Sequence, residues 1–201
     1  MSDCNPLNLR EEFIQAIQAT LETPQIKNRI LAFSDEYSSF EHWFNWEVFH
    51  AFQAICREKK YSIQRELRYP KPSLGLADIA LSCDKITIDN KDVIRIESKL
   101  IWDNSIADKC IESAVRDAER IVSVGIGLLV IIAVSAGKSV KNQAWPPIIH
   151  GSPVELISKL QVRLTSLGMM SEPQIIFQHD ASADSDTWVS PQVRIAVYRV
   201  G

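Results

Sequence analysis

Hydrophobic positions along the chain change their spacing several times, and each change predicts a new secondary-structure element. Apolar residues spaced three and four apart indicate helices, while alternation or a short continuous apolar run indicates a strand. Helices are expected as two short segments within 8–34, and over 40–59, 103–122 and 152–168. Strands are expected over 61–69, 76–82, 93–101, 126–135, 174–178 and 193–200, with a polar loop over 180–190 before the last strand.

The starts of the expected helices carry capping signals. Thr23 followed by Pro24 predicts a helix start, because proline is favoured at the first helical position. A capping box pairs a polar side chain before the helix with an acidic or amide side chain three residues later. Such pairs are Asn8 with Glu11, Ser38 with Glu41, and Ser152 with Glu155.

The order of these elements predicts a mixed α/β sandwich with a sheet at its centre. The run 126–135 is too apolar for a surface strand, so it is expected to be covered on both faces. If it lies parallel to 93–101, the helix between them forms a right-handed crossover. The length suits one globular domain, expected over 39–201, preceded by a short helical extension over 1–38.

Charged side chains interrupt two of the apolar strands. In the strand 93–101, alternate residues face opposite sides, so Glu97 and Lys99 point the same way, about 6–7 Å apart along the strand. Asp78 interrupts the strand 76–82, where an aspartate is disfavoured. If these two strands form a hairpin, Asp78 lies beside Glu97.

Two neighbouring carboxylates repel each other, and a divalent cation removes that conflict. Mg²⁺ takes oxygen ligands, including one or two carboxylates, and keeps several waters. The cation and a neighbouring base can turn one water into a nucleophile. Lys99 could orient or deprotonate that water, or stabilise the charged transition state. The pattern therefore predicts a Mg²⁺ site, with Mn²⁺ as a substitute.

The aspartate, then eighteen residues, then Glu97-Ser98-Lys99 resembles the signature of the PD-(D/E)xK nuclease superfamily. The resemblance covers roughly residues 40–135. It implies a restriction endonuclease-like three-layer sandwich, in which helices flank a central mixed β-sheet. The residues that it implicates are the metal ligands Asp78, Glu97, Ser98 (through its carbonyl) and Glu47, an accessory acid, and the catalytic Lys99.

The sequence departs from the signature at Ala77, which stands before the aspartate where the signature's name has proline. The acid-x-Lys pattern occurs at 58–60, 89–91 and 97–99, and only the third lies inside an apolar strand that follows another strand with an embedded aspartate. In many members, the helix after this strand presents a basic or amide residue to the phosphate. The candidates for that contact are Lys109, Arg116 and Arg120.

The resemblance implies a metal-dependent DNA endonuclease that hydrolyses phosphodiester bonds, of a restriction, defence or repair type. Cleavage of both strands usually calls for two active sites, so a homodimer is a plausible partner arrangement, with the N-terminal helices as its interface. Two alternatives stay open: a catalytically inactive binding or regulatory module with the same fold, and an RNA nuclease. The structural alternative for Glu97 and Lys99 is a cross-strand ion pair on a solvated face, and for Glu47 a surface carboxylate.

Composition limits these expectations. A net charge of −3 does not favour a broad nucleic-acid surface, because nonspecific affinity comes from neutralising phosphates. Any such surface must therefore be local. The four cysteines lack metal-binding spacing, and Cys56 and Cys110 are expected as buried thiols, which fits a reducing cytoplasm. The longest apolar run, 126–134, is far below the roughly 20 residues needed to span a bilayer, so no membrane partner is expected.

Overall fold

The structure is a computed structural model that describes residues 4–35, 39–88, 91–135, 138–139, 152–169, 172–180, 183–185, 188–189 and 191–201. Its α-helices are Pro6–Leu21 (α1), Pro24–Asp35 (α2), Glu41–Lys59 (α3), Ala107–Val122 (α4) and Pro153–Ser166 (α5), with a short 3₁₀ turn at Pro72–Leu74 (η1). Its strands are Ser62–Arg68 (β1), Leu76–Ser82 (β2), Ile94–Trp102 (β3), Gly127–Ser135 (β4), Lys138–Ser139 (β5), Gln174–His179 (β6), Ala183–Ser185 (β7), Trp188–Val189 (β8) and Gln192–Val200 (β9).

Six strands form one mixed sheet in the order β1-β2-β3-β4-β9-β6. β3 and β4 are parallel and joined through α4, while the other neighbouring pairs are antiparallel. Every residue of β4 is buried, which confirms the prediction that this strand is covered on both faces. The mixed α/β architecture expected from the order of elements is confirmed.

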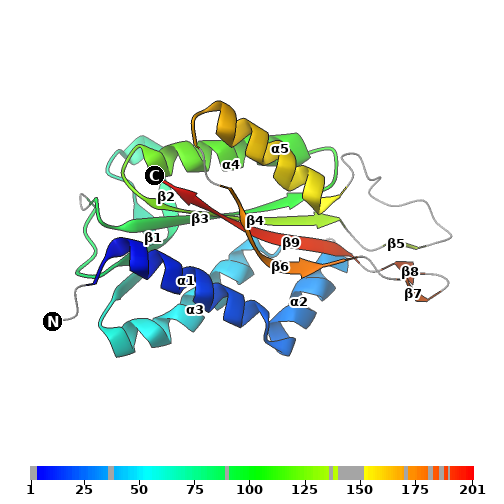
Figure 1. The fold of residues 1–201 in the computed structure, drawn as a ribbon, viewed down its shortest axis with the longest axis horizontal. Coiled ribbons are helices and arrows are strands. Elements are labelled where there is room, and N and C mark those ends of the chain that lie inside the picture. The colour runs from blue at the N-terminus through cyan, green and yellow to red at the C-terminus, as the bar shows by residue number, and fades with distance from the viewer. Residues whose placement is uncertain are drawn as a thin grey trace.

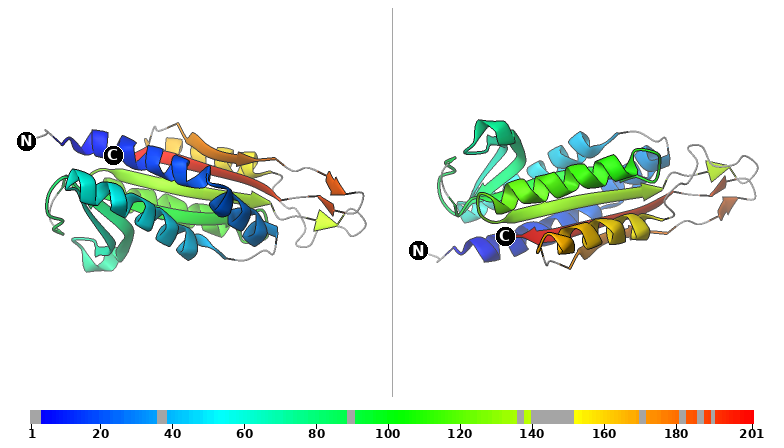
Figure 2. Two further views of the ribbon diagram at one scale, coloured as in Figure 1. Left: turned by 90° about the horizontal axis from the view of Figure 1, so that it is seen from below. Right: turned by 90° about the horizontal axis from the view of Figure 1, so that it is seen from above.

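Helices cover the sheet on both faces and complete three layers (Figures 1 and 2). α1, α2 and α3 lie on one face, and α4 and α5 lie on the other. The alternation of β3 separates the two cores, because Ile96 and Leu100 pack with the first group of helices and Ile101 packs with the second. The odd-numbered side chains of β3 therefore face α4.

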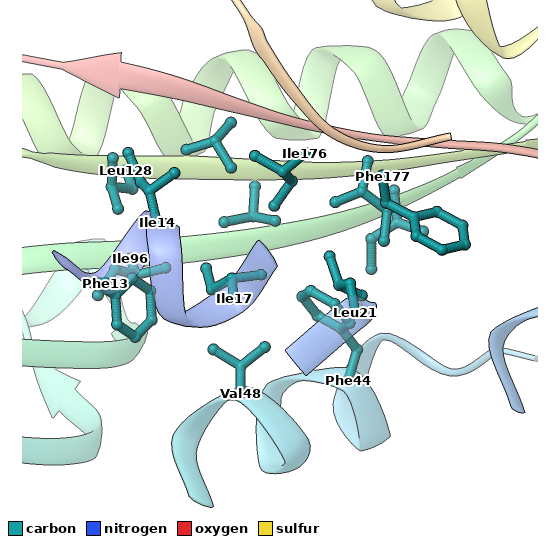
Figure 3. Packing of buried hydrophobic residues seen from close by; sticks show 14 of the residues in the cluster. Phe13, Ile14, Ile17, Leu21, Phe44, Val48, Ile96, Leu128, Ile176 and Phe177 are labelled. Atoms are coloured by element: carbon teal, nitrogen blue, oxygen red, sulfur yellow. The ribbon is translucent and has the colours of Figure 1, made fainter. Parts of the chain in front are cut away.

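The N-terminal helices belong to the main core. Phe13, Ile14 and Ile17 of α1 are buried together with the apolar face of α3 and the central strands. Figure 3 shows these side chains directed towards Ile96 and Leu128 of the sheet. The boundary predicted at residue 38 therefore does not separate two cores, and the buried face of α1 is already occupied.

The capping predictions had mixed outcomes. Ser152 and Glu155 form the expected capping box, and α2 begins at Pro24 as predicted. α1 begins earlier than expected, because Asn5 rather than Asn8 is its N-cap. The pair of Ser38 with Glu41 falls partly outside the described residues, and the Glu41 carboxylate makes a different contact, described below.

The predicted polar loop over 180–190 contains short strands. β7 and β8 pair with each other, and β8 pairs with β5, in a second sheet of three strands. In Figure 1 this small sheet lies beyond one end of the main sheet, away from both chain termini. The loop prediction failed here because two- and three-residue strands are too short to show a hydrophobic period.

The cysteines differ in part from the expectation. Cys4, just before α1, forms a disulfide with Cys83, just after β2. Cys56 is a buried thiol as predicted, and Cys110 is a half-buried one. Within the described parts of the chain, the helices lack the length and apolar character needed to cross a membrane.

Candidate active site

The candidate site lies where β2 and β3 diverge. The two strands pair in antiparallel register at Leu81 with Ile94 and at Ile79 with Ile96, and the regular pairing ends there. One more step in this register places Asp78 opposite Glu97. Because directly opposite residues of an antiparallel pair share a face, this register puts both carboxylates on one face, and the charge of Asp78 helps to raise the pKa of Glu97.

Beyond the last paired residues, carboxylates take the place of β2 as partners of β3. The N–H of Ser98 donates to Oδ2 of Asp78 at 2.8 Å. The N–H of Leu100 donates to Oε2 of Glu41, the first residue of α3, at 2.6 Å. Buried N–H groups need a partner, so the divergence of the strands holds two carboxylates at the edge of β3.

The register also fixes the direction of the Ser98 carbonyl. The N–H groups of Arg95 and Asp103 donate towards the β4 side of β3, whereas that of Ser98 donates towards β2. In a strand, the N–H and C=O of one residue point to the same side. The Ser98 carbonyl therefore faces the same gap as Asp78.

Glu97 is held by an aromatic and a basic side chain. The Tyr69 hydroxyl donates to Oε1 of Glu97 at 2.9 Å, and the Arg120 guanidinium lies 3.3 Å from the same oxygen. The Tyr69 ring contacts two cations, with the guanidinium carbons of Arg95 and Arg120 lying 5.7 and 5.6 Å from its centroid. Glu97 is 4% exposed, so these contacts are shielded from bulk water.

Lys99 is also paired, on the same face of β3 as Glu97. Its Nζ lies 3.4 Å from Oε1 of Glu41 and 3.7 Å from Oδ2 of Asp117 on α4. Asp117 in turn pairs with Arg120, three residues along the helix. Arg120 also donates to the carbonyl of Leu74 at 2.7 Å, which ties α4 to the η1 segment.

The cluster has an excess of negative charge. It combines four carboxylates with two cations, so its net charge would be −2 if every group were ionised. Its carboxylates are Glu41, Asp78, Glu97 and Asp117, and its cations are Lys99 and Arg120. A buried excess charge is costly unless it is neutralised by protons or by a bound cation.

The pKa values of the acids reflect this excess. Burial, together with the charges of Asp78 and Asp117, raises the pKa of Glu97 to about 8. Burial also raises the pKa of Asp78 and of Glu41. Of these acids, Glu97 is therefore the one that is disposed to hold a proton near neutral pH.

The pKa of Lys99 is also raised, which for a basic group favours the charged form. Burial alone would lower the pKa of Lys99, but Glu41 and Asp117 outweigh burial and raise it. Lys99 is consequently held as an ammonium group. In this arrangement it balances charge and can donate to an anion, and it does not serve as a base until its carboxylate partners are neutralised.

The structure does not bring Glu47 into this cluster. Oε1 of Glu47 lies 3.4 Å from a nitrogen of Arg29 on α2. Asn45, on the same helix, hydrogen-bonds to Asp78, and two residues along a helix correspond to about 200° of rotation. Glu47 therefore points away from Asp78, and the acid that α3 contributes is Glu41.

Sequence reasoning missed several members of the cluster. Glu41 matched a capping pattern, which concealed its contact with β3. Tyr69 follows β1 next to a proline, and its position carries no local signal. Asp117 lies three residues before Arg120 on α4, a spacing that is also typical of an ordinary surface ion pair. Of the three candidate phosphate contacts, the structure places Arg120 in the cluster, while Arg116 and Lys109 line the clefts beside it.

The side chains and the carbonyl at this site are of the types that bind a divalent cation, but they are not grouped as a metal site requires. Asp78, Glu97 and the Ser98 carbonyl are oxygen donors directed at one gap, and oxygen donors are those that Mg²⁺ takes. Within the described residues, however, three or more His, Cys, Asp or Glu side chains are nowhere grouped closely enough to hold a metal ion. In the structure, the carboxylate oxygens accept hydrogen bonds from N–H and O–H groups of the protein and form ion pairs with its basic side chains.

Comparisons of the chain with protein-family models, with curated proteins and with solved structures found no match.

Proposed function

We propose that the protein is a Mg²⁺-dependent endonuclease that hydrolyses phosphodiester bonds in DNA. The observation that supports the proposal is the register that puts Asp78 and Glu97 on one face of neighbouring strands, with Lys99 two residues further on the same face. A restriction endonuclease-like fold, with a restriction, defence or repair role, is part of the proposal.

Asp78, Glu97 and the carbonyl of Ser98 would hold the cation. Bound there, the cation would supply positive charge against the phosphate oxygens and lower the pKa of the attacking water. It would also balance the two negative charges that Lys99 and Arg120 leave uncompensated.

The chain's own residues would then prepare the phosphate for attack. Glu41 and Asp117 hold Lys99 as an ammonium group, so Lys99 can donate to a phosphate oxygen and stabilise the transition state. Arg120, fixed by Leu74 and Asp117, keeps Glu97 oriented. Burial of Glu97 excludes competing water from one side of the site.

The second candidate is a catalytically inactive module with the same architecture. It is favoured by the lack of a metal-holding group among the described residues and by the two ion pairs of Lys99. In that function Asp78 and Glu41 would serve only as hydrogen-bond acceptors for the backbone N–H groups at the edge of β3.

The proposal extends to the substrate, the assembly and the location of the protein. RNA is an alternative substrate for the same site, and a homodimer would supply a second site for double-strand cleavage. A cytoplasmic location is also proposed, although the disulfide between Cys4 and Cys83 counts against it, since cytosolic thiols are kept reduced.

The direct experiment incubates plasmid DNA with the protein in Mg²⁺, in Mn²⁺ or in EDTA. Lys99→Ala is the test variant, and Lys27→Ala, an exposed lysine on α2, is the matched control. Metal-dependent cutting is expected in the wild type and the control, with a loss of about 100-fold or more in the Lys99 variant. Equal cutting by both variants would remove the proposed mechanism.

Thermal unfolding separates the two candidates without a substrate. A cation at 100 times its dissociation constant should add about 2.7 kcal/mol to the free energy of unfolding. A nuclease is expected to melt at a higher temperature in Mg²⁺, and Glu97→Gln should abolish the shift. An inactive module is expected to show no shift in either form.

A further inference from the structure

Two clefts of the structure meet at Lys99. One has a volume of about 590 Å³ and the other of about 580 Å³, and Lys99 and Ser113 line both. Both volumes lie in the usual range for small-ligand sites, about 300–1,000 Å³. The proposed catalytic lysine therefore stands between two separate spaces.

The two clefts differ in chemistry. The first is polar and is lined by Arg116, Asp117 and Arg120, with Leu74 as its main apolar contribution. The second is lined by the largely buried Leu100 and Trp102 and by the exposed Ile106, together with the charged residues Glu41, Lys99 and Lys109. A charged group suits the first cleft, and a flat, largely apolar group suits the second.

Both clefts follow one side of α4. The helix contributes Lys109, Cys110 and Ser113 to the second cleft and Ser113, Arg116 and Arg120 to the first. These positions recur at three- and four-residue spacing, so they share one face of the helix. From Lys109 to Arg120, the two clefts together extend roughly 17 Å along α4, at 1.5 Å per residue.

Ile106 is the unusual residue of this surface. It precedes α4 and is 47% exposed, although it directly adjoins the buried Trp102 side of the cleft. Its backbone N–H donates to Oδ1 of Asn104 at 3.0 Å, which fixes the turn that presents it. A large apolar side chain held at the rim of a cleft is suited to contact an apolar part of a ligand.

We propose that the cleft bounded by Leu100, Trp102 and Ile106 binds the base and sugar of the nucleotide adjoining the phosphate at Lys99. The inference rests on the proposed function and narrows its substrate. A base can enter this cleft only when it is unpaired, so the substrate class is single-stranded DNA or DNA with an unpaired nucleotide at the cut. Lys109 lines the same cleft and would supply a cation for a neighbouring phosphate of the strand.

The cations that line the clefts favour a nucleotide over an uncharged apolar ligand. The combined clefts are lined by the cations Lys99, Lys109, Arg116 and Arg120 and by the acids Glu41, Asp117 and Glu119. The cations exceed the acids by one, and cations can neutralise a phosphate. The alternation of cationic and apolar surface matches a strand, in which bases alternate with phosphates and stack on apolar or aromatic side chains.

The test measures binding of a fluorescein-labelled single-stranded oligonucleotide by anisotropy, with Ca²⁺ in place of Mg²⁺ and the intact length of the probe checked on a gel. Ile106→Glu is the test variant. Val122→Glu is its control, because Val122 is an equally exposed apolar residue at the other end of α4 that lines neither cleft. Ile106→Leu is the conservative variant.

The wild type is expected to bind the single strand more tightly than a blunt duplex of the same sequence. Ile106→Glu should weaken single-strand binding about tenfold, while Ile106→Leu and Val122→Glu stay within about twofold of the wild type. Circular dichroism and the melting temperature establish that each variant is folded.

Other outcomes overturn the inference in distinguishable ways. If the wild type binds DNA and the two glutamate variants bind equally well, the base cleft is wrong while the nuclease proposal stands. If the wild type binds the blunt duplex more tightly than the single strand, the base cleft is also wrong and the nuclease proposal stands. If the wild type binds neither DNA probe, the proposed function fails and the base cleft fails with it.

Discussion

The hydroxyl of Tyr69 donates a hydrogen bond of 2.9 Å to Oε1 of Glu97, across 28 residues of sequence. The ring of Tyr69 is itself placed by the guanidinium groups of Arg95 and Arg120. The most perturbed acid of the candidate site therefore depends on a residue outside the acid-x-Lys pattern. A variant that removes only the hydroxyl distinguishes the effect of this hydrogen bond on Glu97 from the effect of the aromatic ring.

Tyr69→Phe keeps the aromatic ring and removes the donor. Since the hydrogen bond favours the ionised carboxylate, its loss should move the pKa of Glu97 above its present value of about 8. Hydrogen bonds to charged groups contribute about 1.5–3 kcal/mol, so Mg²⁺ binding through the ionised carboxylate should weaken by about tenfold to a hundredfold. Carboxyl NMR titration gives the pKa, and isothermal titration gives the affinity. An unchanged Glu97 titration would show that the hydroxyl has no such influence.

The stability of the metal-free protein should depend on pH through Glu97. Its pKa in the folded state, about 8, lies above the ordinary value of 4.5. A raised pKa gives stability that is fully present below about pH 4.5 and is lost as the pH rises through about 8. The melting temperature is therefore expected to fall over that range. Asp78 and Glu41, whose pKa values are also raised by burial, act in the same direction.

Glu97→Gln should flatten this decline, because it replaces the titrating group with a neutral one of similar shape. Saturating Mg²⁺ should flatten it as well if the cation binds the carboxylates. Differential scanning calorimetry between pH 5 and 9 supplies the measurement. A melting temperature that rises across this range in the wild type would contradict the assignment of a buried, protonated Glu97.

Glu41 and Glu47 form a matched pair of acids on α3. Glu41→Ala leaves the Leu100 N–H without its carboxylate partner, which should lower the free energy of unfolding by about 1–3 kcal/mol. Glu47→Ala removes only a surface pair with Arg29, which should cost at most about 1 kcal/mol. Urea denaturation compares the two.

Cleavage activity provides a second comparison of the same pair. Glu41→Ala should also reduce metal-dependent cutting, because Lys99 loses one of its two acidic partners. Glu47→Ala should leave cutting within about twofold of the wild type. If Glu47→Ala reduced cutting more than Glu41→Ala, Glu47 would be the accessory acid after all.

Reduction of the disulfide between Cys4 and Cys83 should destabilise the fold. The bond closes a chain segment with a sequence separation of 79, and such a cross-link typically contributes about 2–4 kcal/mol. Dithiothreitol and Cys4→Ser should lower the melting temperature by a similar amount, and Cys110→Ser, the control, should respond to dithiothreitol as the wild type does. A wild-type melting temperature that ignores dithiothreitol would indicate that the bond contributes little.

The local alternation of one strand was enough to place Glu97 and Lys99 on a common face, because successive side chains of a strand point to opposite sides. The continuous apolar run over β4 was likewise enough to predict a central strand. Asp78 required one further assumption, a hairpin, and the register that the structure adopts meets it.

Glu41, Tyr69 and Asp117 could be assigned only once the chain was folded. Their partners lie 18 to 59 residues away in the sequence, and no periodic pattern encodes such a separation. The loss of pairing between β2 and β3 leaves the N–H of Leu100 in need of an acceptor, which Glu41 supplies. Tyr69 and Asp117 are selected by the charged groups of Glu97 and Lys99. Short-range geometry decides which side chains of one strand are neighbours, but long-range packing decides which distant acids and cations balance them.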